Sequence, residues 1–482
     1  MNPPSFFRGR RGILLALVLL VLGLAAAAGG WAHAQRSRVI AYTPARPPGL
    51  EGEVALSERL SAAEHQARSW FRPAAGLAEL GRLYHANGQA APAALCYTGL
   101  RDLKPREALW PHLLASLLAG AGRLDDALPL WRDAVRLDPT YVPARLRLGD
   151  VLLKSNQPLE ARRIYDEVLQ QSPDQPYALL GLARCHLAAG DWTRAREVLL
   201  RAQERHPDFV GTLTLLVSVH EHFGDADAAK AVQAAIGMRE FHDLRDPWVD
   251  GLLEECYDAY RVSVGAAVAT YSGEPNTAVH LLERAIELAP REGTYQRQLG
   301  KLHYQLKQHE PARRHLERAV ALSPDDADAW SLLVDLLNTL GDDAAMQRAL
   351  NAGLNQCPNS AALRFANGSR LSKLGRVGEA IAELKRAQRL KPDEVRPSIE
   401  LALLYFRQER IDDGIAELRQ ALVAEPGHPL ALSILTRHAI ETGDEVQARQ
   451  GLNQLRGLHR LAPGDLATLV NDYHGRFRRD PW

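Results

Sequence analysis

Cysteine and histidine are the residues of this sequence that could bind a metal or supply a reactive nucleophile. The densest histidines, His220 and His222, are two residues apart, so a helix would turn their rings to different faces. No CxxC or HExxH spacing occurs, and these are spacings that zinc and haem sites use. We therefore expect no metal site and no cofactor.

The cysteines are spread widely along the chain. Three of the four fall within expected helices, where a free thiol is commonly buried as a small apolar side chain. We interpret them as buried thiols, and a disulfide in an oxidising compartment is the alternative. The four are Cys96, Cys185, Cys256 and Cys357.

Other signatures of catalysis and of nucleic-acid binding are also missing from the sequence. It has no glycine-rich phosphate loop, no nucleophile elbow and no carboxylate pair that stands out from the surface acids. Lys plus Arg and Asp plus Glu balance at 58 each, whereas a nucleic-acid partner requires a basic surface. We expect no catalytic residue, no enzyme activity and no nucleic-acid partner.

A period of 34 residues organises most of the chain. When prolines spaced at this period are set as position 32, eleven units result; position 15 is Gly in eight of them and position 20 is Ala in nine. Such regular spacing indicates a repeat architecture. The periodic prolines are Pro105, Pro139, Pro173 and Pro207, followed by Pro290, Pro324, Pro358, Pro392 and Pro426.

Each unit predicts a helical hairpin. Apolar residues at positions 4, 7, 8 and 11 give the stripe of a first helix, and the glycine at position 15 ends that helix because glycine adopts positive φ cheaply. Small residues at positions 8 and 20, such as Gly300 and Ala312, let the two helices approach closely. Each hairpin leaves one apolar face open, so neighbouring hairpins must stack.

The repeating pattern resembles the tetratricopeptide repeat over residues 74–462. The resemblance implies an all-α fold, a right-handed superhelical α-solenoid of about eleven helical hairpins with capping helices. Repeats 1–5 would occupy residues 74–243 and repeats 6–11 residues 259–462. A helix within 54–73 would cap the first end, and 463–482 would supply a C-terminal capping helix and tail.

The N-terminal residues 1–34 predict an export signal or a membrane anchor. Arginines precede an uncharged run from Gly12 to Ala28, which is near the lower length limit for crossing a bilayer. The small-x-small triplet at 32–34 favours cleavage, whereas the flanking arginines would equally hold an uncleaved helix. Either outcome predicts an exported protein, periplasmic or anchored in the inner membrane, with a Pro-rich spacer at 35–53.

Residues 244–258 interrupt the period between the two sets of repeats. This insertion is denser in acids and aromatics than the flanking repeats. One interpretation makes it a binding loop, with Trp248 and Tyr257 as contact residues, or a hinge. The other makes it a structural plug that covers the mismatch between two stacks of repeats.

In the tetratricopeptide family, positions 2, 5, 9, 12 and 13 of each first helix line the inner, concave surface. Carried over to this sequence, they predict a groove that binds a protein or an extended peptide through aromatic and basic side chains, which are common interface anchors. For any single residue, packing between repeats is the alternative. The predicted groove residues are Tyr260, Tyr271, Arg297, Lys301, Tyr304, Asn338, Phe365, Lys373, Phe406 and Arg407.

The resemblance and the N-terminal segment together imply a bacterial envelope protein of the tetratricopeptide type. We expect a non-catalytic scaffold for protein–protein interactions, acting in the assembly of a surface or secretion complex. The alternative is an accessory or regulatory subunit of an envelope enzyme complex, a transferase or a multi-haem electron-transfer complex, whose catalytic chain is separate. The sequence names neither the partner nor the oligomeric state.

Overall fold

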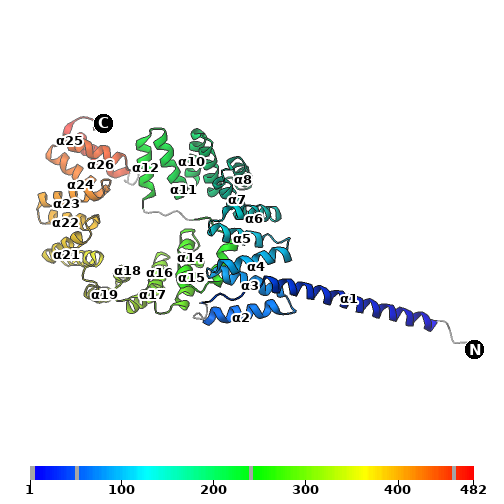
Figure 1. Ribbon diagram of the computed structural model, residues 1–482. Helices are drawn as coiled ribbons and strands as arrows, with labels where there is room; N and C mark the ends of the chain where they lie inside the picture. The colour runs from blue at the N-terminus through cyan, green and yellow to red at the C-terminus, as the bar shows by residue number, and fades with distance from the viewer. Residues whose placement is uncertain (1–5, 49–53, 238–242, 459–462) are drawn as a thin grey trace, which may run out of the picture. The chain divides into compact units, whose positions relative to one another are not determined.

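The computed structural model describes residues 6–48, 54–237, 243–458 and 463–482, with side chains described from Leu19 onward except at 463–465. These residues form 26 α-helices and one 3-10 helix, most of them in antiparallel pairs (Figure 1). The all-α solenoid architecture predicted from the period is confirmed. The chain divides into two compact units, residues 1–288 and 289–482.

The first unit begins with α1 (Phe6–Tyr42) and α2 (Val54–Arg68) and contains repeats 1–6. Two short elements, α13 (Pro247–Asp250) and the 3-10 helix η1 (Gly251–Glu255), lie between repeats 5 and 6. The repeat hairpins are α3 (Pro73–Ala86) with α4 (Ala90–Leu103), α5 (Leu109–Gly120) with α6 (Leu124–Leu137), α7 (Val142–Lys154) with α8 (Pro158–Gln171), α9 (Pro176–Ala188) with α10 (Trp192–Arg205), α11 (Val210–His222) with α12 (Ala226–Ile236), and α14 (Ala259–Tyr271) with α15 (Pro275–Leu288).

The second unit contains repeats 7–11 and a final helix, α26 (Pro463–Phe477). Leu469 and Tyr473 of α26 are buried in one apolar cluster with Leu452 of the last hairpin, so α26 covers the open apolar face of that hairpin. The hairpins are α16 (Gly293–Gln305) with α17 (His309–Leu322), α18 (Ala327–Leu340) with α19 (Asp343–Gln356), α20 (Ala361–Lys373) with α21 (Val377–Leu390), α22 (Val395–Arg407) with α23 (Ile411–Ala424), and α24 (Pro429–Thr442) with α25 (Glu445–Arg456).

Position 15 has a positive φ angle in every repeat. Eight repeats place glycine there, with φ between 71° and 81°. The other three place Asn156, Lys307 and Glu409 there, at φ 57°, 58° and 62°. The turn between the two helices therefore imposes the left-handed conformation even where the side chain disfavours it. This explains why glycine is the commonest residue at that position.

Replacing Lys307 or Glu409 by glycine should stabilise the protein by about 0.5–1 kcal/mol, because glycine removes the strain of an L side chain in the left-handed region. Urea denaturation followed by circular dichroism measures the change. Lys301→Gly is the matched control, since Lys301 lies inside α16 and glycine there should destabilise by about 1 kcal/mol. A loss of stability in Lys307→Gly would contradict the strain argument.

Close approach of the two helices in a hairpin depends on small residues, as the sequence predicted. A Cβ atom added to Gly300 would lie 2.7 Å from Cγ of Leu316 on α17. Ala312 on the same helix is fully buried. A larger side chain at either position would push the two helices apart.

The end of α1 packs onto the first repeat. Val39 is fully buried, the Tyr42 hydroxyl donates a hydrogen bond to Asp102, and Arg46 pairs with Glu64 of α2 at 3.1 Å. Figure 1 shows α1 as one unbroken helix that reaches α3 and α4. The expected spacer at 35–53 is thus helical to Tyr42 and in contact with the repeats, and its last residues, 49–53, lie outside the described ones.

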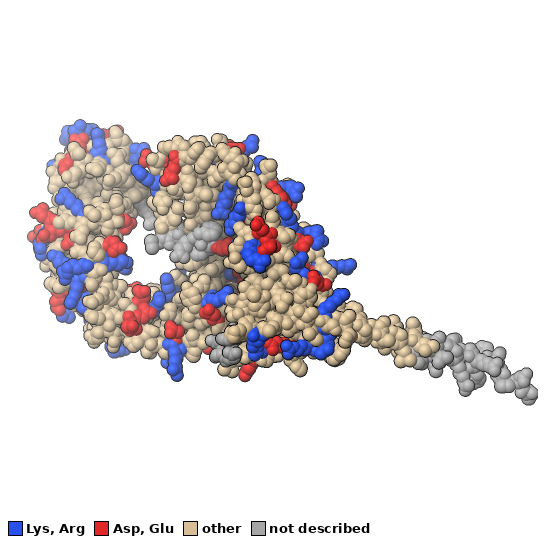
Figure 2. Space-filling model, in the orientation of Figure 1, with Lys and Arg blue, Asp and Glu red and all other residues tan. Residues whose placement is uncertain are grey.

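The predicted signal or anchor at residues 1–34 lies partly outside the described residues, because side chains before Leu19 are not described. In the part that is described, no helix has a stretch both long and apolar enough to cross a membrane. Downstream, Figure 2 shows basic and acidic side chains interspersed over the visible face, as their equal numbers lead one to expect.

All four cysteines are buried and form no disulfide, in agreement with the interpretation as buried thiols. Burial raises the pKa of the Cys96 and Cys185 thiols to about 12. A thiol with such a pKa is almost wholly protonated near neutral pH and is a poor nucleophile.

Candidate protein-binding grooves

The first candidate site is a groove in the second unit, on the face formed by α18, α20 and α22. It consists of two adjoining cavities of about 510 Å³ and 310 Å³, which share Phe365, Arg396 and Glu400. We call this surface the C-terminal groove. Its remaining described lining residues are Ser331, Val334, Asp335, Asn338, Asp343, Met346, Gln347, Ala362, Ala366, Ser369, Arg370, Ser372, Lys373, Leu374, Ile399, Leu403, Leu404, Arg407, His428 and Leu430.

An aromatic ring and a guanidinium form the centre of the C-terminal groove. The Arg396 guanidinium lies 4.9 Å from the centroid of the Phe365 ring, a cation–π arrangement. The Arg396 guanidinium also donates a hydrogen bond of 2.7 Å to Glu394, and this hydrogen bond raises the pKa of Arg396. The groove therefore presents a positioned positive charge over an aromatic surface.

Acidic and apolar side chains surround this centre. Burial raises the pKa of the Asp335 carboxyl, and the charge of Arg396 lowers it in part. Ser369 donates a hydrogen bond to Glu400. Leu403 and Leu430 are 38% and 46% exposed and add apolar surface at one end. Arginine, aromatic and aliphatic side chains thus lie together, and arginine and aromatic residues are enriched in protein interfaces.

The structure brings four of the predicted groove residues together and leaves six elsewhere. Asn338, Phe365, Lys373 and Arg407 line the C-terminal groove. Arg396 and Leu403 occupy positions 2 and 9 of a first helix and are not among the predicted residues, although both line the groove. The family's first-helix positions could not select Met346, because it belongs to a second helix, at a position where most repeats have alanine.

Three of the other predicted residues take part in packing or capping. The Tyr304 hydroxyl lies 2.9 Å from Thr339 Oγ1 and its ring packs on a buried apolar cluster. Phe406 also packs on a buried cluster, and its ring fills the space beside Gly414. Arg297 pairs with Asp326, the N-cap of α18, at 2.7 Å. For these three, the alternative of packing between repeats describes the structure better than a free groove contact.

The remaining three are exposed and do not line the C-terminal groove. Lys301 lies on α16. Tyr260 and Tyr271, on α14 of the first unit, are 69% and 63% exposed.

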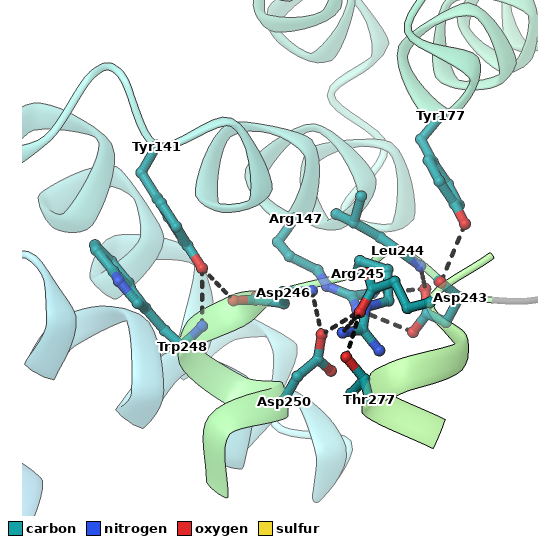
Figure 3. Close-up of polar contacts among 11 residues, drawn as sticks. Tyr141, Arg147, Tyr177, Asp243, Leu244, Arg245, Asp246, Trp248, Asp250 and Thr277 are labelled. Carbon is teal, nitrogen blue, oxygen red and sulfur yellow. Dashed lines mark hydrogen bonds and ion pairs between the residues drawn. The ribbon is translucent and has the colours of Figure 1, made fainter. Parts of the chain in front are cut away.

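The second candidate site is in the first unit, on the inner face of repeats 1–4. Residues 243–258, which we call the groove segment, run along this face from repeat 4 back to repeat 1, and Figure 3 shows the part from Asp243 to Asp250. The face itself, which we call the N-terminal groove, contacts the segment through Arg59, Arg82, Asn87, His112, Tyr141, Arg147 and Tyr177.

Asp246 is the most deeply held residue of the groove segment. Its carboxylate lies 2.7 Å from Nε2 of His112 and accepts a hydrogen bond of 2.6 Å from the Tyr141 hydroxyl. Asp246 is 2% exposed and His112 is fully buried. Burial alone would raise the pKa of Asp246, but the hydrogen bonds from His112 and Tyr141 and the nearby charges outweigh it and hold this pKa below its ordinary value.

Trp248 stacks on Tyr141 beside this carboxylate. The ring centroids are 3.6 Å apart and the planes are inclined by 11°, and the His112 ring meets Trp248 edge-on at 5.4 Å. The Trp248 amide donates a hydrogen bond to the Tyr141 hydroxyl. Figure 3 shows Trp248 and Asp246 on either side of the end of the Tyr141 side chain.

Contacts at both ends align the groove segment. At repeat 3, Arg147 makes two hydrogen bonds to the Asp243 carboxylate, at 3.1 and 2.9 Å. At repeat 1, the Asn87 amide donates to the Glu255 carbonyl and accepts from the Tyr257 amide, at 2.9 and 2.8 Å. Glu255 also pairs with Arg59 at 2.8 Å.

The groove segment also contacts repeat 6. Arg284 of α15 donates to the Cys256 carbonyl at 2.8 Å and lies over the Tyr257 ring, and Arg245 pairs with Glu274 at 2.9 Å. Within the described residues, no extensive contact joins α12 to α14. The insertion therefore does not lie at a junction between repeats 5 and 6. It runs back over repeats 1–4 and joins repeat 6 to them.

Comparisons with known proteins identify the repeats. One model of the tetratricopeptide repeat matches residues 118–167, 152–211 and 269–336, and a second matches residues 399–465. The chain therefore contains tetratricopeptide repeats within these residues. Domains of this class bind proteins or peptides, so the coarse function is that of a protein–protein interaction scaffold.

Relatives of known name cover part of the chain. Protein CTR9 homolog of Arabidopsis thaliana is 27% identical over 299 residues, which are 55% of this chain and 27% of that protein. Cellulose synthase 2 operon protein C of Komagataeibacter xylinus is 27% identical over 383 residues, 68% of this chain and 26% of that protein. The chain thus spans about a quarter of the length of these two curated relatives.

Solved structures of other repeat proteins are similar at low identity. Yeast Tom70 is 13% identical, with 84% of this chain and 96% of that chain covered and a TM-score of 0.38. YrrB, described as a tetratricopeptide-repeat protein with an unusual peptide-binding site, is 20% identical, with 36% of this chain and 91% of that chain covered and a TM-score of 0.30.

Proposed function

We propose that the protein is a scaffold of the bacterial cell envelope that holds a segment of a partner protein in the C-terminal groove during assembly of a surface or secretion complex. The observation that carries the proposal is the centre of that groove. Arg396 is fixed over Phe365 by Glu394, next to the exposed Leu403 and Leu430. An arginine and an aromatic ring beside an apolar surface are typical anchors of protein interfaces.

The partner segment for this groove should carry an apolar side chain and an acidic one. The apolar side chain would cover Phe365 and Leu403, and the acid would pair with an exposed basic residue such as Lys373 or Arg407. The nearby Asp335 and Glu400 disfavour a segment that is acidic throughout, because like charges repel. A mixed, amphipathic segment fits this surface best.

The envelope location rests on the N-terminal sequence and on one relative. An arginine-flanked apolar run is the usual form of an export signal or anchor. The Komagataeibacter relative is named for a cellulose synthase operon, and cellulose is a surface polysaccharide. The same name supports the alternative function, in which the chain is an accessory subunit of an envelope enzyme complex whose catalytic chain is separate.

A photo-crosslinking amino acid at Asn338, in the C-terminal groove, tests the proposal in living cells. We expect one partner protein in the adduct, recovered from the envelope fraction. Phe365→Ala or Arg396→Glu should reduce this adduct about 30-fold, the effect of losing one interface anchor worth about 2 kcal/mol. Mass spectrometry of the adduct separates an assembly protein from the catalytic chain of an enzyme.

The matched control places the same amino acid at Arg386, an exposed residue of α21 that does not line the groove. Circular dichroism of the purified variants must show unchanged helicity. An adduct of equal strength from Arg386, or one that survives both substitutions, would rule out the C-terminal groove as the binding site. Recovery of the adduct only from the cytosol would rule out the envelope role.

A further inference from the structure

The N-terminal groove holds residues 243–258 in the way that a receptor holds a peptide. The contacts come from side chains of repeats 1–4 and from Arg59 of α2, and they reach both the side chains and the backbone of the groove segment. The Asn87 amide pairs with the backbone at Glu255 and Tyr257. Such a pairing is independent of the side chains of the bound chain, so it fixes the direction and register of a peptide but not its sequence.

Sequence selectivity in this groove comes from one pair of positions. His112 and Tyr141 together bind the Asp246 carboxylate, and Tyr141 stacks on the ring of Trp248 two residues later. The sequence element that this groove binds therefore consists of an acidic residue, then any residue, then an aromatic residue. Flanking basic side chains, Arg147 on one side and Arg59 on the other, add selectivity for further acids.

The groove segment has the properties of a detachable element. Its regular structure consists of a four-residue helix and a five-residue 3-10 helix, and helices of such length are not stable by themselves. The repeats beneath it bury their own apolar residues, such as Leu113, Leu146 and Leu180, between paired helices. Loss of the segment would uncover the polar side chains and the Tyr141 ring of the groove, as well as Leu252 and Cys256 of the segment itself, and would leave the cores of repeats 1–4 packed.

We propose that the N-terminal groove is a second partner-binding site, occupied in the free protein by its own residues 243–258. The partner that fits it is a peptide segment that forms a short helical turn like α13, with an acidic residue two positions before an aromatic residue, flanked by further acids. Because the groove segment belongs to the same chain, its effective concentration at the groove is on the order of millimolar. A partner segment must bind tightly enough to displace the internal segment. The internal segment therefore sets the minimum affinity and concentration that a partner needs.

A synthetic peptide of residues 243–258 with a fluorescent label is the probe for this site. Its binding to the full chain is measured by fluorescence anisotropy, for the wild type and for a double variant with Asp246→Ala and Trp248→Ala, in which the internal segment is weakened. We expect the double variant to bind the peptide at least about 30-fold more tightly than the wild type does. Adding His112→Ala to the double variant should abolish the gain.

Two controls define specificity. A peptide that itself carries the Trp248→Ala change should not bind the double variant. Glu254→Ala in the chain changes an exposed acid of the same segment, which pairs with His280, and should leave the wild-type behaviour intact. Equal peptide affinity of wild type and double variant, or peptide binding that persists after His112→Ala, would overturn the proposal.

Hydrogen exchange of the wild-type chain tests the proposal without any substitution. We expect the backbone amides of 244–257 to exchange at least about tenfold faster than those of α5 and α7, because the segment opens while the repeats stay folded. Protection equal to that of α5 and α7 would show that the segment opens only when the repeats unfold. The segment would then be a permanent structural element, and the proposal would fail even if the variants did not fold.

Discussion

Asp246→Ala is expected to release residues 243–258 from the N-terminal groove while the repeats remain helical. The substitution leaves the buried His112 ring and the Tyr141 hydroxyl without their shared partner, and breaking one side of a buried pair typically costs about 3–5 kcal/mol. The loss of stability cannot exceed the free energy of docking the segment. Once the segment has left the groove, His112 and Tyr141 regain contact with water. Hydrogen exchange should show lost protection at 244–257 and retained protection in α5 and α7.

The pH dependence of docking follows from the same carboxylate. The pKa of Asp246 is lowered in the folded protein, so its contribution to stability is present above the ordinary aspartate pKa of about 3.9 and is lost as the pH falls through the lower folded value. Acidification below pH about 4 should therefore loosen the segment in the wild type. The charged or titratable groups that face Asp246 include His112, Tyr141 and Arg147.

Asp246→Asn and Glu254→Ala serve as references for this experiment. Asparagine keeps one acceptor but no charge, so Asp246→Asn should weaken docking less than Asp246→Ala does. Because asparagine does not titrate, acidification should cause no further loss of docking through position 246. Glu254 is an exposed acid of the same segment, and its loss should change docking by less than about 1 kcal/mol. Unchanged protection of 244–257 in Asp246→Ala would mean that the buried pair does not hold the segment.

Tyr165→Ala should lower the free energy of unfolding of the first unit by about 3–5 kcal/mol. The ring of Tyr165 is fully buried and fills the space that glycine leaves in two successive first helices. A Cβ atom added to Gly149 would lie 2.6 Å from the Tyr165 ring, and one added to Gly181 would lie closer still. Removal of the ring therefore opens a cavity that joins two repeats, and the surrounding helices can close it only partly.

The hydroxyl of Tyr165 contributes separately from its ring. It donates a hydrogen bond of 2.8 Å to Asp150, a carboxyl whose pKa burial raises. Tyr165→Phe keeps the ring and should cost about 1 kcal/mol. Urea denaturation of the two variants, followed by circular dichroism, separates the packing and hydrogen-bond contributions. Similar losses for phenylalanine and alanine would show that the cavity is not the main effect.

The sequence predicted the repeats well because each repeat is specified locally. Position 15 requires a left-handed residue in every hairpin, and eight glycines make that requirement visible. Small residues at position 8, such as Gly300, mark the close contact between paired helices. These constraints recur every 34 residues, so the period exposes them. The three exceptions, Asn156, Lys307 and Glu409, also occupy position 15, so they do not obscure the period.

The route of the insertion could not be predicted because its contacts are neither local nor periodic. Asp246 meets His112 and Tyr141, which precede it by more than 100 residues and lie in different repeats. The density of acids and aromatics in 244–258 did signal a special segment. Its complement, the basic and aromatic side chains of repeats 1–4, is dispersed among ordinary helical residues, and nothing in one sequence connects the two sets.

The candidate groove was predicted in part for a related reason. The first-helix positions of the family select Phe365, Lys373 and the neighbouring Asn338, which line one cavity in the structure. Tyr304 and Phe406 lie outside this groove, because a large ring at the edge of a hairpin lowers its free energy by packing on the nearest apolar cluster. Both rings do so here.

The docking of α1 on repeat 1 determines what proteolytic removal of residues 1–34 would leave behind. Val39, Tyr42 and Arg46 make their contacts with the repeats and with α2 beyond that point. The shortened chain would keep about two turns of helix attached to α3 and α4, so its new amino terminus would be ordered at a fixed place on the first hairpin. In the uncut chain the same contacts make the junction stiff, and any force applied along α1 would pass directly to repeat 1.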